Sequence, residues 1–172
     1  MALILEDGTV VTNANTYATA DTVESYCSDR LLTMASGDTV EGESTEDKEA
    51  AILRAMVFIE SQDYKGVKTD RDNPLKWPRD GVEDLDGFAV ESDEIPQEVI
   101  NALCRAFYEE MIDPGVLQPN VGRDDLVKRE KIDVIETEYF EHRSPVTTRF
   151  TVINDYLKGL IRSGSSADVV RV

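Results

Sequence analysis

Several residue types that common chemistries need are scarce in this chain. His142 is the only histidine, and Cys27 and Cys104 are the only cysteines. Two cysteines are too few for a disulfide framework, and with one histidine their spacing predicts no zinc site. We therefore expect free, buried thiols in a reducing cytoplasm.

Other absences concern longer patterns. The chain has no run of about 18 apolar residues, which a membrane-spanning helix would need. Its first residues lack a basic stretch followed by a long apolar one, so we expect no signal peptide. Neither a P-loop nor a dinucleotide-binding glycine motif is present, and no cofactor is expected.

Basic charge is also scarce. Lys and Arg number 18 against 35 Asp and Glu, and the formal net charge is −17. The acid is concentrated in residues 1–63, which hold 13 acidic and 3 basic side chains. Neutralising DNA phosphates requires clustered Lys and Arg, so this composition argues against a general nucleic-acid binder. The simplest alternative is a solvated acidic face that keeps the protein soluble.

The candidates for catalysis or metal binding are weak. His142 lies in a polar stretch, and no nucleophile elbow accompanies it. Asp80, Asp84 and Asp86 resemble a fragment of a calcium loop, but the full ligand order and the closing glutamate are not both met. Asp-Gly turns explain these residues more simply. We therefore expect no enzyme and no metal site.

Apolar periodicity predicts four helices, at about 19–31, 44–63, 96–112 and 151–162. Thr19 and Ser44 suit N-cap positions, and Pro96 suits the first helical position. A strand is predicted over 131–140. The expected fold is mainly α, a small bundle of about four helices with a long Trp/Pro/Gly loop, a short β-strand or hairpin arm and an extended C-terminal tail.

The predicted organisation has four parts. Residues 1–115 form a helical core with an inserted loop at 64–95. An extended or β arm covers 116–150, a C-terminal helix 151–163 and a flexible tail 164–172. A structureless loop as long as 64–95 is uncommon within a compact domain, so we expect it either to be functional or to be held against the core.

Trp77, the only tryptophan, lies in the middle of this loop. Basic residues surround it: Lys65, Lys68, Arg71, Lys76 and Arg79. An aromatic interleaved with basic residues is typical of a single-strand site, yet acidic residues interrupt this one. We favour the alternative, in which Trp77 anchors the loop on the core, helped by Leu75 and Val82, with Leu85 and Phe88 further on.

Several short strings resemble one family of tailed-phage proteins. They are Glu6-Asp7-Gly8, Asn15-Thr16-Tyr17, Tyr64-Lys65-Gly66, Asn73-Pro74-Leu75-Lys76-Trp77-Pro78-Arg79-Asp80-Gly81-Val82, Asp86-Gly87 and Ile95-Pro96. Together they resemble the small head–tail connector, or adaptor, proteins, which are often named "DnaT-like single-stranded DNA-binding" proteins. The resemblance covers about residues 3–112 and is weaker beyond 116.

The resemblance implies a structural protein made in the bacterial host cytoplasm and located in the virion neck. Such proteins form a ring, commonly of twelve copies, under the portal; the ring extends the DNA channel and supports the next neck protein, a stopper or tail terminator. DNA would pass through the lumen without specific binding. The expected portal-docking tail is Val169, Val170, Arg171 and Val172, and the expected loop anchor and inter-subunit loop is Leu75, Trp77, Pro78, Arg79 and Val82.

Two other functions stay open: a single-stranded DNA-binding replication accessory protein, and a small cytosolic enzyme. Charge favours the connector over the binder, because an acidic lumen repels DNA whereas a binder needs an attractive groove. This reasoning predicts weak or no binding of single-stranded DNA at moderate salt. A submicromolar dissociation constant at about 150 mM salt would favour the binder.

Overall fold

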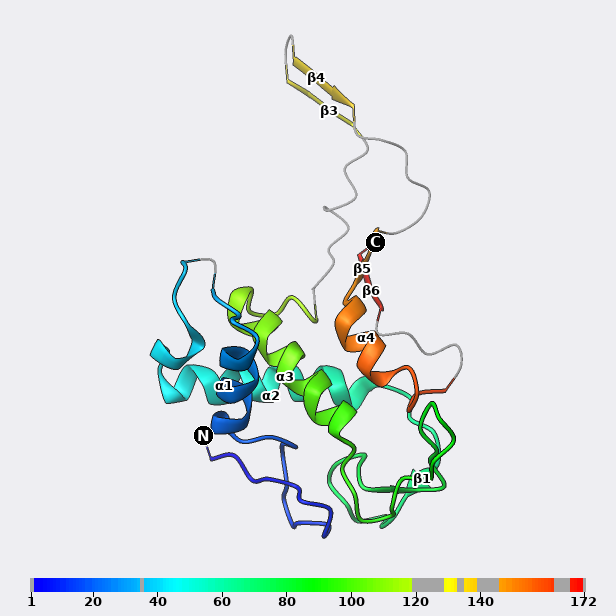
Figure 1. Cartoon of the computed structure of the whole chain (residues 1–172). Coiled ribbons are helices and arrows are strands. Elements are labelled where there is room, and N and C mark those ends of the chain that lie inside the picture. Colours follow the sequence, from blue (N-terminus) through cyan, green and yellow to red (C-terminus); the bar gives the residue numbers. More distant parts are fainter. Residues whose placement is uncertain are drawn as a thin grey trace.

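The computed structural model describes residues 2–34, 36–118, 129–132, 135–138, 146–162 and 168–171. Within these ranges the helices are α1 (Ala20–Asp29), α2 (Thr45–Ser61), α3 (Gln97–Ile112) and α4 (Thr151–Leu157), with one 3-10 turn, η1 (Val40–Gly42) (Figure 1). The fold is mainly α and forms a small helical bundle, as the sequence predicted.

The predicted N-caps of α1 and α2 are confirmed, whereas Pro96 is the N-cap of α3 and not its first helical residue. Thr19 caps α1, where its hydroxyl accepts a hydrogen bond of 3.2 Å from the amide of Thr22. Ser44 caps α2 by accepting from the Asp47 amide at 3.1 Å and donating to Asp47 Oδ2 at 2.6 Å. The end of α1 differs from the prediction, which gave Leu31 to the apolar helix face. The helix stops at Asp29, and Leu31 adopts a φ of 51° and is 87% exposed.

The core lies where α2 and α3 pack along each other and where α3 also contacts α1 and α4 (Figure 1). The largest fully buried apolar side chains are Trp77, Tyr64, Phe107, Ile52, Ile59, Leu103, Ile153, Leu157, Leu160 and Val23. Glu110 of α3 is also buried, and it accepts from Arg54 Nε at 2.8 Å and from the amides of Gly115 and Leu117. These bonds satisfy a carboxylate that would otherwise be costly to bury.

Three antiparallel pairs of short strands complete the described chain. They are β1 (Val67–Lys68) with β2 (Arg79–Asp80), β3 (Arg129–Ile132) with β4 (Ile135–Glu138), and β5 (Val146–Arg149) with β6 (Asp168–Arg171). The β3–β4 pair is a hairpin, which satisfies the expectation of a hairpin arm. The single strand predicted at 131–140 is therefore two shorter strands.

The C-terminal tail differs from the free segment that we expected. Val169, Val170 and Arg171 belong to β6, whose partner is β5 of the same chain. These residues near the C-terminus therefore pair with a strand of the same chain. Val172 lies outside the described residues.

The first half of the 64–95 loop is part of the core rather than an arm. Leu75, Trp77, Pro78, Arg79 and Val82 are all buried, as expected of a loop anchor.

The second half of the loop was predicted wrongly. Leu85 and Phe88 are 66% and 71% exposed instead of pinning the loop. Asp84 Oδ1 accepts from the amides of Asp86 and Phe88, which closes a tight turn at the surface.

No helix among the described residues is both long enough and apolar enough to cross a membrane.

Candidate nucleic-acid interface

Trp77 is fully buried and therefore offers no surface on which a base could stack. Its ring meets the Tyr64 ring edge to face, with centroids 5.5 Å apart and an interplanar angle of 74°. Asn73 Nδ2 donates to the Trp77 carbonyl at 2.8 Å and holds the loop at this point. Of the two interpretations of Trp77, the structure supports the core anchor.

The basic side chains around Trp77 form hydrogen bonds that hold the loop in place. Lys65, Lys68 and Lys76 each donate through Nζ to a backbone carbonyl, those of Gly159, Asn73 and Gln62 respectively.

Arg79 donates to four carbonyls, those of Lys65, Lys76, Gly66 and Tyr64, at 2.6, 3.1, 2.9 and 3.4 Å. Burial lowers the pKa of its guanidinium. The Arg79 guanidinium is therefore engaged by carbonyl groups of its own chain.

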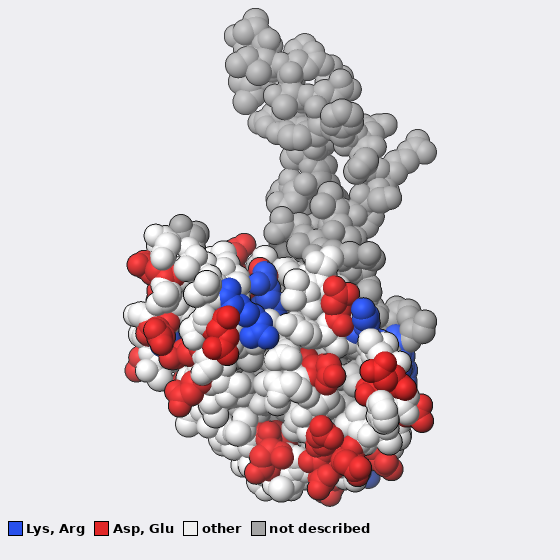
Figure 2. Space-filling model, in the orientation of Figure 1, with Lys and Arg blue, Asp and Glu red and all other residues white. Residues whose placement is uncertain are grey.

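A different group of basic and aromatic residues lies on α1, α3 and α4. We name it the Arg–Tyr face, and it consists of Tyr26, Arg30, Arg105, Tyr108 and Tyr156. In Figure 2 a group of Lys and Arg side chains gathers where α1 and α3 lie, while Asp and Glu side chains form separate patches over other parts of this view. Two arginines of this face each lie over a tyrosine ring.

Arg30 follows the last residue of α1 as its C-cap. Its guanidinium carbon lies 3.7 Å from the centroid of the Tyr26 ring, and its Nη1 donates to the Tyr26 carbonyl at 3.3 Å. A guanidinium over an aromatic face is attracted by the ring quadrupole. Among the described residues no carboxylate lies within ion-pair distance of Arg30, and the residue is exposed.

Arg105 of α3 repeats this pattern. Its guanidinium carbon lies 4.9 Å from the centroid of Tyr108, one turn further along the helix. It also pairs with Glu109 at 2.6 Å, so part of its charge is already balanced. The Tyr108 hydroxyl donates to the Thr33 carbonyl at 2.7 Å and joins α3 to the segment after α1.

The two arginines are brought to one place by the packing of α1 on α3. Both lie close enough to the Cys27 thiol to lower its pKa, although burial dominates and raises that pKa to about 11. Burial likewise raises the pKa of Cys104 to about 12. The Tyr26 hydroxyl meets that of Tyr156 at 3.3 Å, which ties α4 to the same face.

The sequence analysis missed the Arg–Tyr face. Its local signals are an arginine four residues after Tyr26 and a tyrosine three residues after Arg105, spacings that put each pair on one side of a helix. These signals place each pair but do not show that the two pairs meet. That juxtaposition depends on the α1–α3 packing.

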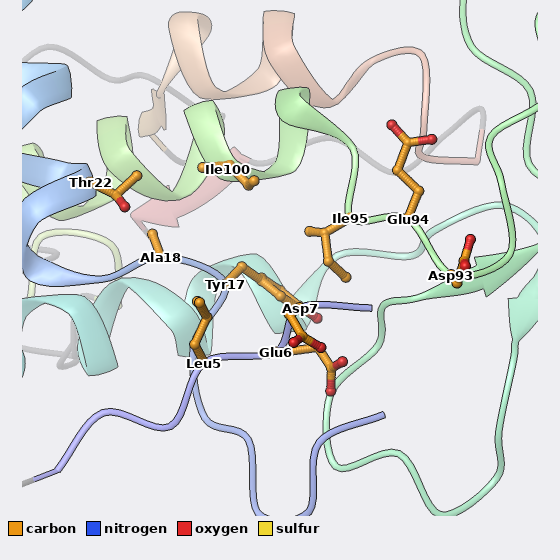
Figure 3. A pocket seen from close by; sticks show the side chains of 10 residues that line it. All are labelled: Leu5, Glu6, Asp7, Tyr17, Ala18, Thr22, Asp93, Glu94, Ile95 and Ile100. Carbon is orange, nitrogen blue, oxygen red and sulfur yellow. The ribbon is translucent and has the colours of Figure 1, made fainter. Parts of the chain in front are cut away.

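A groove of about 490 Å³ lies elsewhere, between the N-terminal segment and the residues just before α3 (Figure 3). Its lining carries carboxylates from Glu6, Asp7, Asp93 and Glu94 and no Lys or Arg. Glu6 is buried and accepts three hydrogen bonds of 2.9 Å, from the amides of Gly8, Val10 and Val11. This groove repels phosphate and is not part of a nucleic-acid interface.

The aspartates of the calcium-loop candidate belong to turns. Asp80 Oδ1 accepts from the Gly81 amide, and Asp84 closes the turn described above, so both act as turn residues. In the described part of the chain, no three His, Cys, Asp or Glu side chains are placed to hold a metal ion. His142 lies outside the described residues.

The comparisons with known proteins bear on the function. A family model described as "Putative DnaT-like ssDNA binding protein" matches residues 1–172. The comparison with curated proteins and the comparison with solved structures each gave no match.

The family match contradicts the expected head–tail connector and agrees with the alternative of a single-stranded DNA-binding protein. The ring of twelve copies, the portal and neck partners and the virion location rested on the connector resemblance, and we do not carry them forward. The same holds for portal docking by residues 169–172. Because the family model matches the whole chain, the protein belongs to the family of DnaT-like single-stranded DNA-binding proteins.

Proposed function

We propose that this protein binds single-stranded DNA through the Arg–Tyr face and acts as a non-enzymatic accessory in DNA handling. Membership in this family supports single-stranded DNA as the ligand. The observation that supports the location is the pair of arginines, Arg30 and Arg105, each placed over a tyrosine ring on neighbouring helices.

The chemistry of this face suits a single strand. Stacking on a ring orients a guanidinium, and its N–H groups then match the oxygens of a phosphate. Tyr156 is only partly buried, so it is the tyrosine of the face that can offer ring surface to a base. A groove that combines cations with aromatic rings is the usual arrangement for sequence-tolerant binding of single strands.

The net charge of −17 disfavours duplex DNA more than single-stranded DNA and does not exclude DNA binding. A duplex is stiff and presents phosphates along its whole length, so it would press some of them against the acidic surface around the face. A single strand bends and can leave that surface after a few nucleotides. We therefore expect modest affinity, strong salt dependence and a preference for single-stranded over duplex DNA.

The test is fluorescence anisotropy with a labelled oligo-deoxythymidylate at about 50 mM and about 150 mM salt. Arg30→Ala should weaken binding about fivefold, the effect of losing roughly 1 kcal/mol of charged contact. Arg30→Lys keeps the charge but not the planar, stacked group, and it should recover only part of the loss. Arg71→Ala is the matched control, because Arg71 is an exposed arginine of the loop outside the face.

Two results would overturn the proposal. One is no saturable binding by the wild-type protein at about 50 mM salt, where electrostatic attraction is strongest. The other is equal loss in Arg30→Ala and Arg71→Ala, which would show a diffuse charge effect instead of a site. Thermal unfolding of each variant establishes that a loss of binding is not a loss of fold.

A further inference from the structure

The groove before α3 combines apolar and acidic lining. Leu5, Ile95 and Ile100 supply apolar lining, and the carboxylates of Asp7, Asp93 and Glu94 belong to its edge (Figure 3). Leu5 is 38% exposed, and Ile95 and Ile100 are partly buried, so apolar surface remains open to solvent here. A volume of about 490 Å³ lies within the usual range of small-ligand pockets, about 300–1,000 Å³, and holds one or two large side chains.

The two walls of this groove are held together before any ligand arrives. Gly8, at a φ of +103°, passes so close to Asp93 that an added Cβ would lie 1.8 Å from the Asp93 carbonyl oxygen. The Glu6 carboxylate fixes the same turn through the amides of Gly8, Val10 and Val11. A preformed cleft loses little conformational entropy when it is filled.

Two of the rim carboxylates have no side-chain partner among the residues that the structure describes. Asp7 accepts from the hydroxyl and amide of Thr9 and so belongs to its own turn. Asp93 and Glu94 are exposed, and among the described residues no cation pairs with either. Their charges are free to meet a positively charged partner.

From this charge pattern we propose that the groove docks a basic segment of a partner protein, in which an apolar side chain is flanked by lysines or arginines. The apolar side chain would occupy the pocket over Leu5, Ile95 and Ile100, and the flanking cations would meet Asp93 and Glu94. Opposite charge around an apolar centre is the usual anatomy of a specific protein contact. Nucleic acid is excluded as the occupant, because its phosphates would face the acidic rim.

This site is independent of the proposed DNA interface, because the groove and the Arg–Tyr face share no residue. A protein with both surfaces would join a single strand to a basic partner. Each surface can fail its own test without affecting the other.

The test uses a fluorescein-labelled peptide with two central leucines flanked on both sides by lysines. One matched peptide carries serines in place of the leucines, and another carries glutamates in place of the lysines. Wild-type protein should bind the first peptide at least about fivefold more tightly than either matched peptide, since both the apolar and the charged contacts contribute. Amide and methyl NMR shifts should move at Leu5, Ile95 and Ile100.

Variants then locate the binding. Asp93→Asn combined with Glu94→Gln should weaken peptide binding about fivefold or more and leave the thermal unfolding midpoint within about a degree, because both carboxylates are exposed and neither pairs with a described residue. Asp38→Asn combined with Glu41→Gln removes the same charge from an exposed stretch away from the groove and should leave binding unchanged.

The docking site would be overturned by equal binding of the serine peptide, by equal loss in the two double variants, or by no binding to wild-type protein. Unchanged peptide binding in Arg30→Ala would confirm that the groove works independently of the DNA interface. Loss of peptide binding in that variant would show that the peptide binds the Arg–Tyr face, and it would refute docking in the groove.

Discussion

The hydroxyl of Tyr17 donates a hydrogen bond of 2.5 Å to Oε1 of Glu60. The same hydroxyl accepts from the Trp77 amide at 3.0 Å, and Glu60 Oε2 accepts from the Lys76 amide at 2.9 Å. One carboxylate on α2 thus joins the segment before α1 to the loop that carries the only tryptophan. Burial raises the pKa of Glu60, and these hydrogen bonds only partly offset it.

This raised pKa of Glu60 predicts a pH dependence of stability. The folded protein holds the Glu60 proton more tightly than the unfolded chain, whose pKa is near 4.5. The free energy of unfolding should therefore fall as pH rises from the unfolded pKa through the higher folded one. Urea unfolding of wild type and Glu60→Gln between about pH 4 and pH 7 checks this. The wild type should lose stability relative to the variant, and a constant difference would contradict the prediction.

The burial of Trp77 predicts how its fluorescence behaves. Emission should be blue-shifted in the folded protein and should not change when single-stranded DNA is added, because the indole has no exposed surface. Trp77→Ala should cost about 3–5 kcal/mol of stability. Trp77→Phe should cost less, partly because the buried indole Nε1 has no hydrogen-bond partner in the described structure and its removal is favourable. Quenching by DNA would place the tryptophan in the interface.

Gly8 and Gly37 form a matched pair for testing the tight wall of the groove. Both have positive φ, but an added Cβ at Gly8 meets the Asp93 carbonyl at 1.8 Å, whereas no described residue offers an atom within 4 Å of a Cβ at Gly37. Gly37→Ala should cost only the backbone strain, about 1–2 kcal/mol. Gly8→Ala should cost clearly more and should also abolish peptide docking. Equal chemical denaturation midpoints for the two variants would refute the close approach.

Salt dependence measures how many phosphates the Arg–Tyr face neutralises. Each phosphate contact on a single strand contributes about −0.7 to the slope of log K against log salt. Removing Arg30 should therefore make the slope shallower by about 0.7. Arg71→Ala should leave the slope unchanged. A slope that is the same in Arg30→Ala and wild type would mean that Arg30 contacts no phosphate.

The cysteines should resist alkylation in the folded protein. Burial raises the pKa of Cys27 to about 11 and that of Cys104 to about 12, so at pH 8 the thiolate fraction of Cys27 is about one in a thousand. Iodoacetamide labelling followed by mass spectrometry should be slow in buffer and fast in urea. Rapid labelling in buffer would show that the α1–α3 contact opens readily.

Local sequence signals determined the helices of this protein. Thr19, Ser44 and Pro96 mark the helix starts because capping depends on a few neighbouring residues. The same local view failed at Leu31, which fits the apolar period but follows the last helical residue. It failed again at Phe88, where the turn around Asp84 turns an aromatic side chain to solvent.

The candidate sites depended on contacts between distant segments. Tyr26 and Tyr156 meet across 130 residues, and the groove needs Gly8 to lie against Asp93. The basic residues around Trp77 looked like a binding stripe in the sequence, but folding directs them to backbone carbonyls.

Net charge was the feature that the sequence determined completely, and it misled the first functional interpretation. Charge is a sum over the chain, whereas binding depends on the few charges that reach one place. The sequence by itself determined the acidity and the helix starts, since these follow from composition or from neighbouring residues. It left two interpretations of Trp77 open, and contacts with Tyr17 and Tyr64 decided for the core anchor. Only the tertiary structure decided which cations gather beside tyrosines and which carboxylates border a cleft, because packing alone brings those distant side chains together.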